Sequence, residues 1–204
     1  MRVLIDTAAS VDAMDRPRDD LNLAKFPEDL ARYEVVLKQS RPELVIECGT
    51  WRGGSALWFA AHDVDVVTID VVDEAIAAAR EHPRVTRVLG DSESSAVVQQ
   101  VAQLTAGRRT MVTLDSDHHP FHVRREIELY GPFVSPGCYL VVEDGLLRFV
   151  PSPFDKPFAG PLDAIELLLK GSSTWVRDER IEAMSPISSS PAGWWTKENT
   201  RGAS

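Results

Sequence analysis

Short apolar runs that alternate with helix-like segments are the feature that most constrains how this chain can fold. Buried strands are predicted where such runs are bounded by glycine, proline or charged residues. Five runs fit this description, at 44–48, 64–69, 85–89, 110–114 and 138–142. Segments with helical spacing or helix-start signals separate them. This repeated alternation predicts a parallel sheet with helices on both faces.

The helix predictions rest on capping signals and on the spacing of apolar residues. Pro27 is suited to a first helical position, and the helix that it begins should end near Arg41. Further helices are expected over 73–80 and 97–104, and from Pro120 and Pro161. Two more strands are expected near 173–176 and 191–195. The pair Trp194 and Trp195 is more typical of a core than of a surface that stacks on a ligand.

A chain of 204 residues is long enough for one domain with a sizeable core. We divide it into an N-terminal arm (1–26), one domain (27–197) and a flexible tail (198–204). The stretch 145–160 is rich in proline and phenylalanine and should wall a substrate pocket, with a surface connector as the alternative.

Composition and charge narrow the classes of partner. The net charge of −9, from 22 Lys and Arg against 31 Asp and Glu, disfavours a nucleic-acid partner. No stretch approaches the ~18 apolar residues of a membrane helix, and the N-terminus has no secretory signal, so no membrane partner is expected. Cys48 and Cys138 lie inside apolar strands and fit buried, reduced thiols in a cytoplasmic protein.

Carboxylates follow two of the predicted strands directly. Asp115 comes after the fourth strand, and Glu143 and Asp144 come after the fifth. The carboxyl edge of an open α/β sheet is where ligands bind, so these three acids could converge, with His118 beside them. Oxygen donors of this kind suit Mg²⁺ or another divalent cation. Any one of them could simply cap a strand, but together with the histidine they favour a site.

A glycine-rich turn separates the first strand from the next helix. It contains Gly49, Thr50, Gly53, Gly54 and Ser55. Glycines let a backbone approach a ligand closely, although the spacing matches neither a dinucleotide fingerprint nor a P-loop. Glu47 in the strand end favours a ligand with a positive charge or hydroxyl donors over a phosphate. A tight turn without a ligand remains the alternative.

Three further polar residues follow strand ends. Asp70 lies about 20 residues after the glycine turn, where a carboxylate binds ribose hydroxyls in dinucleotide-type folds. The alternative is that Asp70 caps the helix at 73–80. Asp91 or Ser92 could meet an adenine edge, or could be the N-cap of the next helix.

Taken in order, these segments resemble S-adenosylmethionine (SAM)-dependent methyltransferases. The resemblance is strongest to the group labelled "cephalosporin hydroxylase", which includes metal-dependent macrolide and rhamnosyl sugar O-methyltransferases. It extends from about Pro27 to Trp195. It is carried by Pro27-Glu28-Asp29-Leu30 with Tyr33, Ile46-Glu47-Cys48-Gly49-Thr50 to Gly53-Gly54-Ser55, Asp115-Ser116-Asp117-His118, Val142-Glu143-Asp144-Gly145, Gly160-Pro161-Leu162 and Pro191-Ala192-Gly193.

The resemblance implies an α/β fold, namely a class I methyltransferase Rossmann-like sheet of seven mostly parallel strands with an antiparallel final hairpin. It implies that SAM lies over the glycine turn, with Asp70 on its ribose and 90–92 near its adenine. The implied cofactor set is Glu47, Gly49, Thr50, Gly53, Gly54, Ser55, Asp70, Asp91, Ser92 and Asp115. The implied Mg²⁺ ligands are Asp115, Glu143 and Asp144, with His118 as the general base. Catechol-type methyltransferases have Asn where this chain has Asp144.

The expected activity is methyl transfer from SAM to a hydroxyl of a small-molecule acceptor, such as a sugar moiety or another secondary metabolite in antibiotic biosynthesis. A homo-oligomer is left open. The alternatives are a SAM- or metal-binding partner protein without catalysis, an NAD(P)-linked oxidoreductase and a non-haem iron hydroxylase. The iron site is disfavoured because no histidine has an acid two positions later. Asp117 could orient His118, join the metal or do neither.

Overall fold

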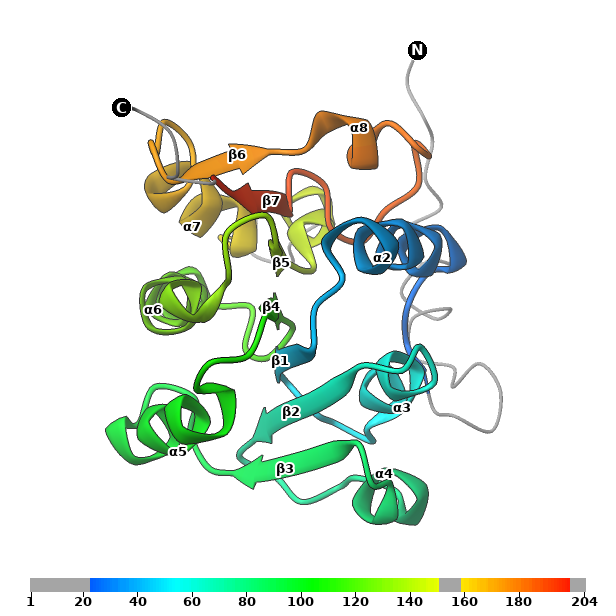
Figure 1. Ribbon diagram of the computed structural model, residues 1–204. Coiled ribbons are helices and arrows are strands. Elements are labelled where there is room, and N and C mark those ends of the chain that lie inside the picture. Colours follow the sequence, from blue (N-terminus) through cyan, green and yellow to red (C-terminus); the bar gives the residue numbers. More distant parts are fainter. Residues whose placement is uncertain (1–22, 151–158, 199–204) are drawn as a thin grey trace, which may run out of the picture.

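The computed structural model describes residues 23–150 and 159–198 and contains one seven-stranded sheet (Figure 1). The strands are β1 (Leu44–Cys48), β2 (Asp65–Asp70), β3 (Val85–Leu89), β4 (Thr110–Leu114), β5 (Tyr139–Val142), β6 (Trp175–Arg177) and β7 (Trp194–Lys197). Their order in the sheet is β3-β2-β1-β4-β5-β7-β6. The β7 strand is antiparallel to both of its neighbours, and the other pairs are parallel. The predicted fold class is confirmed.

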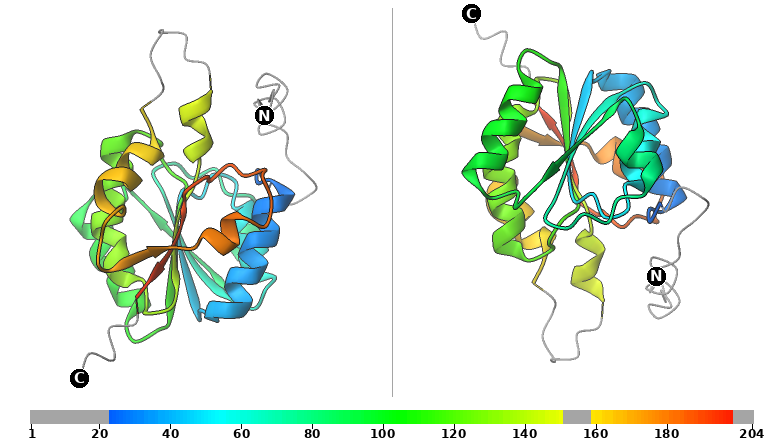
Figure 2. Two further views of the ribbon diagram at one scale, coloured as in Figure 1. Left: turned by 90° about the horizontal axis from the view of Figure 1, so that it is seen from above. Right: turned by 90° about the horizontal axis from the view of Figure 1, so that it is seen from below.

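Helices form a layer on each face of the sheet. On one face lie α5 (Ser95–Thr105), α6 (Pro120–Tyr130) and α7 (Pro161–Leu168). The other side carries α2 (Pro27–Ser40), α3 (Gly54–Ala60), α4 (Ala77–Glu81) and α8 (Glu179–Glu182), as both views in Figure 2 show. Two 3₁₀ helices, η1 (Gly131–Phe133) and η2 (Gly145–Phe149), flank β5.

Most predicted boundaries agree with the structure, and the differences have local causes. The strands predicted at 44–48, 85–89 and 110–114 coincide with β1, β3 and β4. The helix predicted over 73–80 is shorter, because α4 covers only Ala77–Glu81. The start of the stretch 145–160 forms η2 rather than an irregular loop. Its residues 151–158, like 1–22 of the arm and 199–204 of the tail, lie outside the described residues.

The final hairpin lies further along the chain than predicted, and the short helix α8 between its strands was not predicted. Trp194 and Trp195 are both buried, which confirms the predicted core role. Trp194 packs edge-on against Tyr33 of α2, with ring centroids 4.8 Å apart. Cys48 and Cys138 are buried free thiols, as predicted. No helix within the described ranges has the length and apolar character needed to cross a bilayer.

Candidate cofactor and metal site

The site lies where the order of the strands reverses. The chain runs from β1 to β2 on one side and returns to β4 on the other side of β1, so this edge is a topological switch point. Backbone hydrogen bonds continue past the strand ends, since Asp115 N–H donates to Cys48 O (2.8 Å) and Glu143 N–H donates to Leu114 O (3.0 Å). The first residues after β4 and β5 are therefore held side by side.

Gly49 allows the glycine turn to approach the end of β4. Its φ of +98° lies in the region that favours glycine. A Cβ atom at this position would lie 1.9 Å from the carbonyl oxygen of Asp115. Only a residue without a side chain fits between these two backbones. The glycine turn is therefore packed against the sheet edge that carries Asp115, Glu143 and Asp144, which we call the acidic edge.

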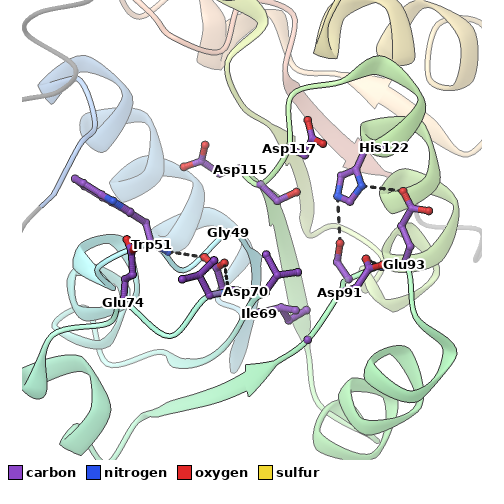
Figure 3. A pocket seen from close by; sticks show the side chains of 15 residues that line it. Gly49, Trp51, Ile69, Asp70, Glu74, Asp91, Glu93, Asp115, Asp117 and His122 are labelled. Carbon is purple, nitrogen blue, oxygen red and sulfur yellow. Dashed lines mark hydrogen bonds and ion pairs between the residues drawn. The ribbon is translucent and has the colours of Figure 1, made fainter.

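A cavity of about 640 Å³ opens at this edge (Figure 3). Its walls include five of the predicted cofactor residues, namely Gly49, Asp70, Asp91, Ser92 and Asp115. Three other predicted residues, Thr50, Gly54 and Ser55, line a smaller adjoining cavity of about 50 Å³. The remaining two do not line either cavity: Glu47 is fully buried in β1, and Gly53 is the N-cap of α3.

Asp70 fastens the glycine turn to the end of β2. Its Oδ2 accepts the backbone N–H groups of Thr50 (3.0 Å) and Trp51 (2.8 Å), and its Oδ1 accepts that of Val72 (3.0 Å). Asp70 does not cap the following helix, because α4 has Ile76 at its N-cap and no side-chain cap. The capping alternative for Asp70 is therefore wrong, and its carboxylate faces the cavity (Figure 3).

The capping alternative for Asp91 and Ser92 is also wrong, because Ser94 caps α5. Asp91 Oδ1 instead accepts the backbone N–H of Glu93 (2.8 Å). Ser92 Oγ donates to Oε1 of Glu126, at 2.6 Å. Both residues shape the cavity wall rather than the helix start.

A polar cluster that the sequence reading missed supports this wall. His122 Nδ1 lies 2.8 Å from Glu93 Oε1, and its Nε2 lies 3.2 Å from Oε1 of the buried Glu126. A hydrogen bond to Glu126 is the main cause that raises the pKa of His122 to about 9. The i,i+4 spacing of His122 and Glu126 was the available sequence signal.

Three of the predicted catalytic and metal residues come together at the edge of the cavity. Asp115, His118 and Asp144 each offer a ligand atom, and these atoms lie within 4.8 Å of one another. His118 Nε2 is 2.9 Å from Asp144 Oδ2 and 3.6 Å from Asp115 Oδ1. Burial lowers the pKa of His118, but the two carboxylates outweigh it and raise the pKa to about 10. Asp117 accepts the backbone N–H of His119 at 2.8 Å.

Glu143 points inward from the same edge. Its Oε1 accepts hydrogen bonds from the hydroxyls of Tyr33 (2.7 Å) and Thr113 (2.8 Å). Both of its oxygens also accept from the ammonium of Lys25 at 2.7 Å, and Lys25 contacts Asp115 Oδ2 at 2.9 Å. Burial lowers the pKa of Lys25, but these carboxylates outweigh it and hold the pKa well above its usual value. No local sequence pattern pointed to Lys25.

The donor set fits a divalent cation. Three carboxylates lie at one sheet edge, where the Lys25 ammonium contacts Asp115 and Glu143 and the His118 ring lies against Asp144. Carboxylate oxygens are the donors that suit Mg²⁺ or a similar ion. Within the described ranges this cluster contains one histidine, whereas a non-haem iron triad uses two. Of the three predicted ligands, Asp115 and Asp144 share this cluster with His118, whereas Glu143 contacts Lys25.

Known proteins show the family and the fold of this chain. The family model described as rhamnosyl O-methyltransferase/CmcI matches residues 20–198. The chain belongs to this family. Family members named rhamnosyl O-methyltransferase include one from Mycobacterium bovis (strain BCG / Pasteur 1173P2), 36% identical over 156 residues, or 72% of this chain and 63% of the relative. Another, from Mycobacterium leprae (strain TN), is 33% identical over 150 residues, or 70% of this chain and 65% of the relative.

The chain thus spans about 63% of the length of the curated relatives it matches first. Solved structures share the fold. One described as CmcI with Mg and SAM has a TM-score of 0.66 at 18% identity, covering 91% of this chain and 78% of that one. A MycE methyltransferase from the mycinamycin biosynthetic pathway, in complex with Mg and SAH, has a TM-score of 0.54 at 19% identity, covering 70% and 39%. A putative caffeoyl-CoA O-methyltransferase from Staphylococcus aureus has a TM-score of 0.60 at 15% identity, covering 94% and 99%.

Proposed function

We propose that this chain is a SAM-dependent O-methyltransferase that requires Mg²⁺ or another divalent cation and acts on a hydroxyl of a sugar moiety. The observation that carries the proposal is the continuity of the site. The cavity behind the glycine turn ends at Asp115, and Asp115 also belongs to the cluster with His118 and Asp144. A methyl donor in the cavity would therefore lie next to the residues that could activate an acceptor.

The cavity has the groups that a nucleoside sulfonium ligand needs. We infer that Asp70 accepts ribose hydroxyls, because its carboxylate lines the cavity and has lone pairs beyond its three backbone hydrogen bonds. Asp91 and Ser92 would lie at the adenine end, on the wall that His122 supports. Acidic residues around the cavity also favour the positive charge of the sulfonium.

Activation of the acceptor is the step that needs the acidic edge. Asp115, Glu143 and Asp144 would hold the divalent cation, which when bound lowers the pKa of a coordinated hydroxyl and fixes its position. Asp144 keeps the ring of His118 facing the edge, since Nε2 lies 2.9 Å from Oδ2. We assign to the His118 ring the removal of the acceptor proton, a role worth about 10²–10⁴-fold in rate. This role requires the neutral ring, which would be favoured once Asp115 and Asp144, the carboxylates beside it, are engaged by a bound cation.

The class of acceptor follows from the family relatives. The mycobacterial members are named rhamnosyl O-methyltransferases, and the MycE methyltransferase comes from the mycinamycin biosynthetic pathway. A sugar hydroxyl has a pKa far above 7, so it needs the activation that the acidic edge offers. A rhamnosylated or other glycosylated metabolite is accordingly the acceptor class that we propose.

Titration calorimetry with SAM and with S-adenosylhomocysteine, followed by a methyl-transfer assay on a panel of glycosylated and phenolic compounds, tests the proposal. We expect binding of both nucleosides, and transfer from SAM to sugar hydroxyls in the presence of Mg²⁺. Binding without transfer to any compound of the panel would favour a partner protein without catalysis. Absence of nucleoside binding would refute the proposal.

A further inference from the structure

The side chain of Lys25 lies within the acidic edge itself. Its Nζ is 2.9 Å from Asp115 Oδ2 and 2.7 Å from each oxygen of Glu143, so all three ammonium donors are used. The side chain is only 5% exposed. The backbone on either side of Lys25 is anchored, because Leu23 before it is buried and helix α2 begins after it at Pro27.

The ammonium and a divalent cation require the same oxygens. Mg²⁺ binds carboxylate oxygens at about 2.0–2.1 Å and prefers a near-octahedral shell. The two carboxylates that Lys25 contacts are two of the three proposed metal ligands. The ammonium on both oxygens of Glu143 and the hydroxyls of Tyr33 and Thr113 on Oε1 together account for the about four hydrogen bonds that a carboxylate accepts. A cation on that carboxylate would therefore have to displace one of these donors. Two positive charges on one pair of carboxylates would also repel each other.

Lys25 also closes a space next to the methyl-donor cavity. The smaller cavity, of about 50 Å³, is lined by Leu23, Ala24 and Lys25 together with the glycine turn. It shares Gly49, Trp51 and Asp115 with the larger cavity. Departure of the Lys25 side chain would therefore enlarge the region between the glycine turn and the acidic edge, where donor and acceptor are proposed to meet.

We propose that Lys25 is an internal counter-ion of the metal site, whose ammonium occupies Asp115 and Glu143 in the metal-free protein and leaves them when a divalent cation binds. The proposal rests on the metal site of the proposed function. It makes binding of the cation competitive with docking of Lys25. The lysine offsets part of the negative charge of the buried Glu143 and the half-buried Asp115 until the cation arrives, and it weakens the cation's apparent affinity in return.

The direct test is chemical labelling of lysine in the whole chain with an N-hydroxysuccinimide ester, read by peptide mass spectrometry with and without MgCl₂. We expect Lys25 to be protected without Mg²⁺ and to label at least about tenfold faster when Mg²⁺ saturates the site. Lys38 is the internal reference, because its side chain is 74% exposed and should label equally in both states. Equal labelling of Lys25 in the two states would overturn the proposal.

Calorimetry with MgCl₂ on variants gives an independent readout. Lys25→Met removes the ammonium at similar size, and we expect it to bind Mg²⁺ at least about tenfold more tightly than the wild type. Lys25→Arg keeps the charge and should not gain affinity, and Lys38→Met is the matched control with unchanged affinity. If Lys25→Met does not fold, the labelling of the wild type still decides the question.

The possible outcomes separate this proposal from the proposed function. Mg²⁺ binding with Lys25 still protected would overturn the counter-ion role and leave a metal-dependent methyltransferase intact. Methyl transfer with no Mg²⁺ binding in either the wild type or Lys25→Met would mean that no cation takes the place of Lys25, which overturns both this proposal and the metal requirement of the proposed function. Displacement of Lys25 by Mg²⁺ in a protein without methyl transfer would support the counter-ion role and refute the catalytic one.

Discussion

His118 Nε2 lies 2.9 Å from Asp144 Oδ2, so the imidazole is held against the acidic edge by the last of the three carboxylates. The histidine comes from the loop after β4, and the acid comes from the end of β5. This contact across two strand ends directs the proposed base toward the place where an acceptor hydroxyl would be bound.

Replacement of His118 tests its role as the base. We expect His118→Asn to lower the turnover number by about 10²–10⁴-fold, because proton removal loses its acceptor. The affinity for S-adenosylhomocysteine should stay nearly constant, because His118 contacts Asp115 and Asp144 rather than the glycine turn. His119→Asn, at the exposed neighbouring histidine, is the control for both readouts. Wild-type turnover in His118→Asn would remove this histidine from the mechanism.

Replacement of Asp70 tests the donor cavity. Asp70→Ala removes an acceptor of three backbone N–H groups and the proposed ribose contact. Hydrogen bonds to a charged group are each worth about 1.5–3 kcal/mol, so affinity for S-adenosylhomocysteine should fall by at least about tenfold. Asp73→Ala is the control, because Asp73 pairs with Arg80. Equal affinities of Asp70→Ala and Asp73→Ala for S-adenosylhomocysteine would argue against binding of the methyl donor at Asp70.

Replacement of Gly49 tests the close approach between the turn and β4. Gly49→Ala should lower the free energy of unfolding by about 2–6 kcal/mol, because overpacking and a strained backbone each cost about 1–3 kcal/mol. Gly107 also has a positive φ, +77°, but nothing lies near a Cβ there. Gly107→Ala should therefore cost only about 1–2 kcal/mol. Urea unfolding measures the loss of unfolding free energy in Gly49→Ala and in Gly107→Ala. Equal losses in the two variants would contradict the predicted clash.

The pKa of His122 predicts a pH dependence of stability. Because the folded pKa of about 9 lies above the unfolded value of about 6.5, the charged ring stabilises the fold fully below pH 6.5. This contribution is lost as pH rises through about 9. The surrounding acids are Glu93, Glu126 and Asp117. In urea unfolding, the free energy of unfolding of the wild type should exceed that of His122→Gln by more at pH 6 than at pH 9.5. A difference that does not change with pH would show that the ring's charge is not what stabilises this wall.

Much of this fold could be predicted from the sequence because its central strands are buried on both faces. The runs that became β1 and β4 are apolar, bounded by turn signals and short, so their limits were visible. The final hairpin was placed too early, because the last strand was predicted at 191–195 although β7 begins only at Trp194. Tertiary packing of Trp194 on Tyr33 fixes that register, and no local pattern encodes it.

The acidic edge could also be predicted from the sequence, but the presence of Lys25 within it could not. Parallel strands bring their carboxyl ends to one edge, so Asp115 and Asp144 could be expected to meet. Lys25 reaches Asp115 from 90 residues away along the chain, and it lies in a segment that the sequence analysis assigns to the N-terminal arm. A contact of that separation leaves no trace in spacing or capping signals. The cluster of His122 and Glu126 was also overlooked, although both residues lie on one face of a single helix.

The requirement for a divalent cation in methyl transfer tests the account most directly. Radiolabelled SAM and a rhamnosylated acceptor would be incubated with protein that has been dialysed against EDTA, before and after MgCl₂ is added in excess of the chelator. We predict that labelled product disappears on dialysis and returns with Mg²⁺. Undiminished product formation in excess EDTA would contradict the account, because the acidic edge would then activate the acceptor without a metal.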